Sequence, residues 1–158
     1  MKQLQIKYNY DFLDKKIYAE TVAVAGEKIS AYCSVIGLPD PFNSRLKDGR
    51  LLVSGRKEVS VINLALFLRN LPRPNIGLEI EGPYLDAGKK LCSLSPIYVD
   101  DVLEVFVCLR NVFPKTGRSG FMIFIDWEIL FCRGKQQVAT IFEKYVLKPY
   151  DAHDNQRE

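Results

Sequence analysis

The sequence predicts an α+β fold in which a strongly coiled antiparallel sheet wraps around a central apolar α-helix. Two observations lead to this expectation. One helical segment, Ser54–Leu71, is apolar around nearly its whole circumference after its first turn. The C-terminal half of the chain contains long segments of alternating polarity joined by short turns. A helix without a polar face must be enclosed by protein, and a coiled sheet can enclose it.

The central helix has clear boundaries. Ser54 or Gly55 can cap its start, and Pro72 ends it. It is too short to span a bilayer, so its apolar surface must be covered by other parts of the chain. The whole interpretation depends on Val59–Leu71 being enclosed on all sides by the sheet that residues 76–148 are expected to form.

Three long strands are predicted after this helix. They are Asp101–Val112, Phe121–Cys132 and Gln137–Lys148. The first two carry their apolar side chains at every second position, namely Leu103, Val105, Val107 and Leu109, then Phe121, Ile123, Ile125, Trp127, Ile129 and Phe131. Strands of about 11 residues exceed the common length and coil strongly. A strongly coiled meander beside an apolar helix is the hot-dog arrangement.

The remaining elements are shorter. Ala25–Ile36 is predicted to be a helix that Gly37 ends, with Ile29, Tyr32, Cys33 and Ile36 on one side. Ile76–Ile80 and Lys90–Leu94 are predicted to be extended, and Pro114–Gly120 a flexible turn. No linker or repeat divides the chain, so residues 1–150 are expected to form one domain, followed by a polar tail at 151–158.

Composition narrows the class of protein. The 158 residues carry a formal net charge of only +3, in scattered pairs, which does not indicate a nucleic-acid partner. The four cysteines lack metal-ligand spacing, so no zinc or other metal site is expected. No phosphate-binding loop, dinucleotide fingerprint or nucleophile elbow is present, and we expect no cofactor. Without a signal peptide or membrane span, a cytoplasmic protein with reduced thiols is the simplest expectation.

Three segments together resemble one family. Ile36–Asn43 resembles the Gly-Asp-x-Asn-Pro-x-His segment of MaoC-like (R)-specific hydratases, and more closely its diverged form in the FAS1-like dehydratase branch. Ser95–Leu103 looks like the family's Pro-containing segment that ends in Gly-Asp-thr-leu. Gly117–Glu128 with Gly134 and Gln137–Ala139 is similar to its last two strands. The resemblance implies a hot-dog fold that binds acyl thioesters of coenzyme A or acyl carrier protein.

The resemblance fails at the catalytic residues. In the family, an Asp and a His of the first segment are understood to handle the water and the protons. Those positions fall on Leu38 and Asn43, and the family's Asn falls on Asp40. The chain's one histidine is His153, in the tail. Losing a positioned acid–base group costs about 10²–10⁴ in rate. Asp40 could act as a lone base, with Asn43 beside it, or could simply form a turn between two prolines.

The binding elements are better preserved. Backbone amides at Ser54 and Gly55, at the start of the predicted central helix, could bind a thioester oxygen, or could simply belong to an ordinary helix cap. Arg56 and Lys57 could contact a phosphate of the acyl carrier, or lie free on the surface.

The sequence therefore predicts an acyl-thioester-binding subunit of a MaoC-like hydratase or dehydratase that lacks the usual Asp/His pair. Open sheet edges favour a dimer, either with itself or with a catalytic MaoC-like subunit. Two alternatives stay open. One is an active hydratase or thioesterase that uses Asp40 and Asn43, and the other is a binding or scaffold protein with no enzymatic role.

Overall fold

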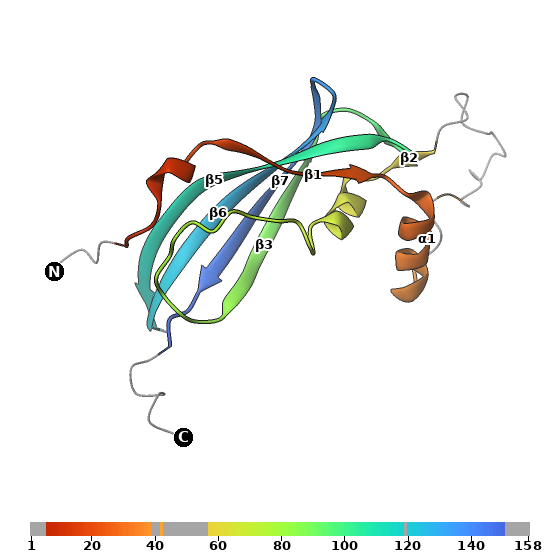
Figure 1. The fold of residues 1–158 in the computed structure, drawn as a ribbon. Coiled ribbons are helices and arrows are strands. Elements are labelled where there is room, and N and C mark those ends of the chain that lie inside the picture. Colours follow the sequence, from red (N-terminus) through yellow and green to blue (C-terminus); the bar gives the residue numbers. More distant parts are fainter. Residues whose placement is uncertain (1–5, 39–41, 43–56, 119, 151–158) are drawn as a thin grey trace.

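The computed structural model describes residues 6–38, 42, 57–118 and 120–150. Among these residues, five antiparallel strands form one curved sheet in the order β1-β5-β6-β7-β3, and β2 pairs with β4 in a small second sheet (Figure 1). The elements are η1 (Tyr10–Phe12), β1 (Lys16–Ala23), α1 (Gly26–Val35), β2 (Glu58–Val59), η2 (Val61–Phe67), β3 (Tyr84–Ser93), β4 (Ile97–Tyr98), β5 (Val102–Gly117), β6 (Gly120–Arg133) and β7 (Gln136–Leu147), where η marks a 3₁₀-helix. The α+β hot-dog class is confirmed.

The three long strands of the meander are confirmed, but β5 is longer than predicted. Pro114, expected in a turn, pairs with Ile123, and the strand continues to Gly117. A proline has no N–H to donate and is tolerated where a strand lies at a sheet edge. The neighbouring strand β1 pairs with β5 only as far as Cys108, so the distal half of β5 is such an edge.

The apolar core lies on one face of the sheet, which we call the inner face. The side chains expected there from the alternation are buried, including Leu103, Leu109, Ile123, Ile129 and Phe131 at 0% exposure. Each such side chain stabilises the fold by about 1.5–3 kcal/mol. Strand β7 extends this face with Ala139, Ile141, Glu143, Tyr145 and Leu147, whose register partners on β6 are the buried residues from Phe131 to Ile123.

The helix α1 is confirmed within one residue at each end, and Gly37 follows it with a positive φ of +72°. Only half of the predicted apolar stripe is buried. Ile29 and Cys33 face the core, whereas Tyr32 and Ile36 are 44% and 47% exposed. The four cysteines, all among the described residues, are unpaired thiols.

The central helix departs from the prediction. A single continuous helix over Ser54–Leu71, enclosed on all sides, is wrong for the part the structure describes: Glu58 and Val59 form β2, and only Val61–Phe67 is helical, as a 3₁₀-helix. Leu64, Leu68 and Leu71 are buried, but Ile62 is 64% exposed. Pairing of Val59 with Ile97 of β4 holds the start of the segment extended, and the short η2 then turns one side to solvent.

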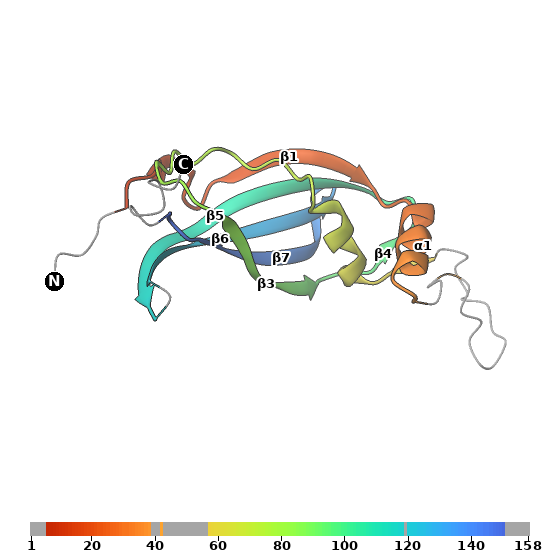
Figure 2. The same ribbon diagram turned by 90° about the horizontal axis from the view of Figure 1, so that it is seen from below.

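The segment after η2, residues 72–82, crosses the inner face and is called the strap (Figures 1 and 2). It contains no strand, so Ile76–Ile80, which was predicted to be extended, does not pair into the sheet. Its Ile76 carbonyl accepts a hydrogen bond from the Asn9 amide at 2.7 Å. The strap leads into β3, where the pairing with β7 is interrupted between Asp86 and Lys89. The extra residue of β3 at this irregularity makes Lys89 the register partner of Glu143.

Candidate functional site on the inner face

The residues that the sequence singled out for chemistry lie outside the described residues. These are Asp40, Asn43, Ser54, Gly55, Arg56 and His153. Their roles stay predictions. Leu38, at the position of the family's Asp, is described and is 56% exposed after the end of α1. Phe42 packs against the core, and the Lys57 ammonium lies 5.5 Å from the centre of its ring.

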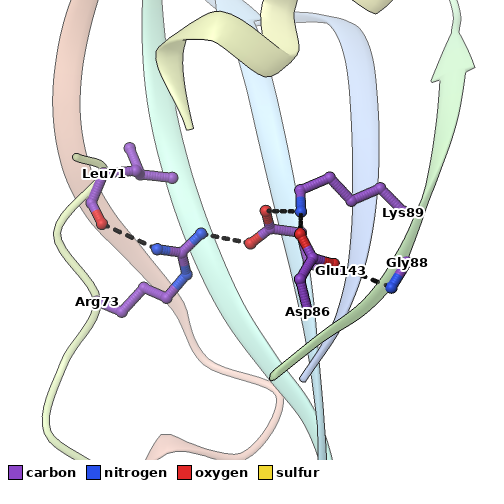
Figure 3. Close-up of polar contacts among 6 residues, drawn as sticks. All are labelled: Leu71, Arg73, Asp86, Gly88, Lys89 and Glu143. Atoms are coloured by element: carbon purple, nitrogen blue, oxygen red, sulfur yellow. Dashed lines mark hydrogen bonds and ion pairs between the residues drawn. The ribbon is translucent and has the colours of Figure 1, made fainter. Parts of the chain in front are cut away.

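The described residues place a different polar group on the inner face. Glu143 of β7 is 2% exposed, and its carboxylate lies between two cations (Figure 3). One terminal nitrogen of Arg73, on the strap, donates a hydrogen bond to Glu143 Oε2. The Lys89 ammonium lies 3.5 Å from Glu143 Oε1 and also pairs with Asp86. We call these four residues the inner-face charge cluster: two positive and two negative side chains.

The local structure explains how these side chains meet. Glu143 on β7 has a register partner on each neighbouring strand. These partners are Lys89 on β3 and Trp127 on β6. Gly88, with φ of +116°, lies at the irregularity of β3, where its amide donates to Asp86 Oδ1 at 2.9 Å. Arg73 comes from the strap and donates from its other terminal nitrogen to the Leu71 carbonyl at 3.1 Å.

Within the cluster, the contact between Lys89 and Asp86 favours the charged form of both side chains. The hydrogen bond from Lys89 holds the pKa of the Asp86 carboxyl below its usual range, helped by the amide of Gly88. Burial acts to lower the pKa of Lys89, but its bond to Asp86 and the charge of Glu143 outweigh it, so this pKa is raised. Burial also raises the pKa of the Tyr145 hydroxyl, whose ring lies 5.5 Å from the Arg73 guanidinium and 5.8 Å from the Lys89 ammonium.

A cavity of about 340 Å³ adjoins the cluster on the inner face. Arg73, Ile76 and Leu78 of the strap cover it, and Ile125, Trp127 and Tyr145 of the sheet form its floor. Trp127 is 5% exposed and Ile125 is 2% exposed, so the floor is largely apolar. Ligand pockets commonly have about this size and combine apolar walls with a few placed polar groups.

Sequence reasoning missed this site, although one signal pointed to it. Glu143 lies at an inward-facing position of β7, between Ile141 and Tyr145, where the alternation of the strand predicts an apolar side chain. A carboxylate at such a position requires a buried cation, because an unpaired buried charge is very costly. Nothing in the local pattern of Arg73, between two prolines, indicates that it supplies that cation.

A larger groove, about 710 Å³, lies where β3 separates from β7, and most of its walls belong to the outer face. Several of its charges are paired with one another: Arg110 donates to Asp14 at 2.6 Å and to Glu128 at 2.7 Å, and Lys144 lies 3.5 Å from Asp126. The inner-face cavity is therefore the better candidate site.

Across the described ranges no three His, Cys, Asp or Glu residues are grouped to hold a metal ion. Within the same ranges no helix has the length and apolar character needed to cross a bilayer.

Comparison by sequence finds no matching family model and no matching curated protein. Comparison by structure does find similar folds. A MaoC-like dehydratase from Rhodospirillum rubrum superposes with a TM-score of 0.62 at 18% identity, over 92% of this chain and 99% of that one. The ChsH1-ChsH2 complex from Mycobacterium tuberculosis gives 0.62 at 16% identity, over 85% and 88%. The HadBC (3R-hydroxyacyl-ACP dehydratase) complex from the same organism gives 0.63 at 10% identity, over 87% and 98%.

The segment Ser95–Leu103 agrees with this likeness in a physical detail. Asp100 occupies the position of the family's glycine and has a positive φ of +69°, a conformation that glycine, and less readily aspartate, adopts. The following Asp101 is 8% exposed, accepts the Tyr98 amide at 2.8 Å and pairs with Arg133. This turn positions the start of β5. The chain therefore has the hot-dog fold of the MaoC-like dehydratases.

Proposed function

We propose that this chain binds an acyl thioester, with the acyl group in the inner-face cavity, as the non-catalytic subunit of a hydratase or dehydratase. The observation that carries the proposal is the cavity itself: about 340 Å³, apolar on its floor, and covered by the strap. A volume of this size accommodates a short acyl chain, whereas a filled inner face would have no room for one.

The proposal that the chain is non-catalytic follows from its residues. Addition of water to an enoyl thioester needs a group that takes a proton from water and another that delivers one to the α-carbon. Leu38 can do neither, and the one histidine belongs to the polar tail. Glu143 is the most buried carboxylate among the described residues, but both of its neighbouring cations, Arg73 and Lys89, pair with it and hold it in the fold.

A partner subunit would complete the site. Strand β3 lies at one edge of the sheet, where its backbone can pair with another strand. Tyr84 and Leu85 on that strand are 56% and 52% exposed, and Ile62 of η2 is 64% exposed. Two of the similar structures are complexes, ChsH1-ChsH2 and HadBC. A dimer with a catalytic MaoC-like subunit, or with a second copy of this chain, would cover these side chains.

Binding is tested first by thermal unfolding with acyl-coenzyme A, using free coenzyme A as the control. At a ligand concentration ten times Kd, binding stabilises the folded chain by about 1.4 kcal/mol. For a domain of this size, that raises Tm by about 3–6 °C. Stabilisation by acyl-coenzyme A beyond that by free coenzyme A supports the proposal. Equal or absent shifts at millimolar concentration favour a scaffold protein without a thioester ligand.

Catalysis is tested with crotonyl-coenzyme A. We expect the isolated chain to be inactive and activity to appear when a MaoC-like subunit that carries the Gly-Asp-x-Asn-Pro-x-His segment and co-purifies with it is added. Turnover by the isolated chain that disappears in Asp40→Asn would contradict the non-catalytic role and favour an enzyme that uses Asp40 with Asn43.

A further inference from the structure

The strap is tied to the rest of the fold at both of its ends. At its start, Arg73 donates a hydrogen bond to Glu143 of β7 (Figure 3). At its end, the Glu81 carbonyl accepts a hydrogen bond from the Tyr150 amide at 3.2 Å. A segment with few hydrogen bonds between its ends opens at a lower cost in free energy than a strand that is paired along its length. The middle of the strap is therefore the part of the cavity's cover that opens most readily.

A single backbone hydrogen bond joins the middle of the strap to another element in the part of the chain that the structure describes. The Asn9 amide donates this bond to the Ile76 carbonyl at 2.7 Å. The two segments approach closely here, because a Cβ added to Gly77 would lie 3.9 Å from the Asn9 nitrogen. Residues 6–14, which we call the N-terminal segment, lie beside the strap in both views of the fold (Figures 1 and 2).

The N-terminal segment is itself anchored to the fold. Ile6 is 6% exposed and belongs to the core, and Tyr8 packs against the core. The Asp14 amide donates to the Leu109 carbonyl of β5 at 2.9 Å, and Leu13 forms a single β-bridge with the same residue. The bond between Asn9 and Ile76 therefore connects the middle of the strap to a segment that the core and β5 hold in place.

The side chains beneath the strap are hidden while this bond is made. Ile76 and Leu78 of the strap line the inner-face cavity, and Trp127 lies in its floor. Ile76 is 6% exposed and Trp127 is 5% exposed. Separation of the middle of the strap from the sheet would expose both side chains and widen the entrance to the cavity.

We propose that the strap is a lid over the inner-face cavity and that the N-terminal segment is the latch that keeps this lid closed. When the bond between Asn9 and Ile76 breaks, the middle of the strap moves away from the sheet while its two ends stay tied, and a ligand enters. Lids of this kind control access to many binding sites. The inference goes beyond the proposed function, because it concerns the opening of the cavity and holds for any ligand.

The test measures the reactivity of a thiol placed under the strap by Ile76→Cys. Asn9→Pro removes the amide that donates to the strap, and the Asn9 φ of −77° suits proline. The matched control is Asn9→Ala, which keeps that amide but, like Asn9→Pro, loses the side-chain oxygen that accepts the Asp11 amide. A hydrogen bond changes an opening equilibrium by about two- to tenfold. Iodoacetamide should therefore alkylate the reporter thiol about two- to tenfold faster with Asn9→Pro than with Asn9→Ala.

Two native thiols serve as internal references in the same samples. Cys33 on α1 and Cys108 on β5 are 5% and 2% exposed, and mass spectrometry of the peptides measures each site separately. Their alkylation rates should be the same with Asn9→Pro and with Asn9→Ala. Equal alkylation of the reporter thiol in the two variants would overturn the inference. An increase at Cys33 and Cys108 as large as that at the reporter thiol would also overturn it, because the whole fold would then have loosened.

A second pair of variants applies if Asn9→Pro does not fold. Ile6→Ala removes apolar packing that anchors the N-terminal segment, whereas its control, Lys7→Ala, changes an exposed neighbour. Ile6→Ala should speed alkylation of the reporter thiol without speeding alkylation of Cys33 and Cys108. The same rate at the reporter thiol in Ile6→Ala and Lys7→Ala would overturn the inference.

Ligand entry is measured by stopped-flow fluorescence without the reporter thiol. Trp127 is the only tryptophan in the chain and lies in the cavity floor, so its fluorescence reports occupancy. Acyl-coenzyme A should associate about two- to tenfold faster with Asn9→Pro than with Asn9→Ala. Equal association rates would overturn the role of the strap as a lid. If no acyl-coenzyme A binds to either variant, the proposed function is wrong, and the alkylation rates still decide whether the N-terminal segment is a latch.

Discussion

Glu143→Gln tests whether the inner-face charge cluster holds the strap onto the sheet. The substitution keeps the shape of the side chain but removes the negative charge between Arg73 and Lys89. Breaking a buried ion pair by removing one partner costs about 3–5 kcal/mol. The side chains of the two cations are 20% and 23% exposed, so solvent screens part of the loss, and we expect about 2–3 kcal/mol.

The assay is urea unfolding followed by circular dichroism, with Tm as a second readout. A loss of 2–3 kcal/mol lowers Tm by about 4–12 °C for a domain of this size. The matched control is Asp86→Asn, whose side chain is 51% exposed and which should cost less than about 1 kcal/mol. The double variant Arg73→Met/Glu143→Leu removes both charges and should recover part of the loss. Equal losses in Glu143→Gln and Asp86→Asn would refute this reasoning.

Two further predictions concern single sites. The pKa of Asp86 is held below its ordinary value of 3.8 by Lys89, so its contribution to stability is present above that pH and is lost as the pH falls through the lower, folded-state pKa. The stability difference between the unmodified protein and Asp86→Asn should therefore shrink between pH 6 and pH 2, and a difference independent of pH would contradict the assignment. Gly82→Ala should cost about 1–3 kcal/mol, because a Cβ there would lie 2.0 Å from the Lys148 carbonyl oxygen. Gly117→Ala meets only a methionine methyl at 3.7 Å and should cost much less in the same unfolding measurement.

The strands were predictable because their signal is local. The alternation from Leu103 to Leu109 and from Ile123 to Phe131 requires only that one face be buried, and it held in the structure. The same rule predicted that Pro114 would end a strand, but it could not anticipate that β1 stops short and leaves that part of β5 at an edge.

The central helix was less predictable because its state depends on distant partners. An apolar run such as Val61–Leu71 indicates burial but not which element covers each side chain. Pairing of Val59 with Ile97 competes with helix formation at its start, and the sheet covers Leu64 but not Ile62. A second chain seated against η2 would cover that side.

The candidate site was the hardest part to predict. Arg73 and Glu143 are 70 residues apart in the chain, and only the crossing of the strap over β7 brings them together. The resemblance to a family directed attention to Asp40 and to the start of the central helix instead, and those positions lie outside the described residues.

The most direct test of acyl binding in the inner-face cavity is calorimetry on a cavity-filling pair of variants. Leu78 on the strap lines the cavity, and its neighbour Glu79 is exposed. Leu78→Trp should weaken acyl-coenzyme A binding by tenfold or more, while Glu79→Trp should leave it unchanged. Acyl-coenzyme A that binds Leu78→Trp as tightly as the unmodified chain would place the acyl group elsewhere and contradict the proposal.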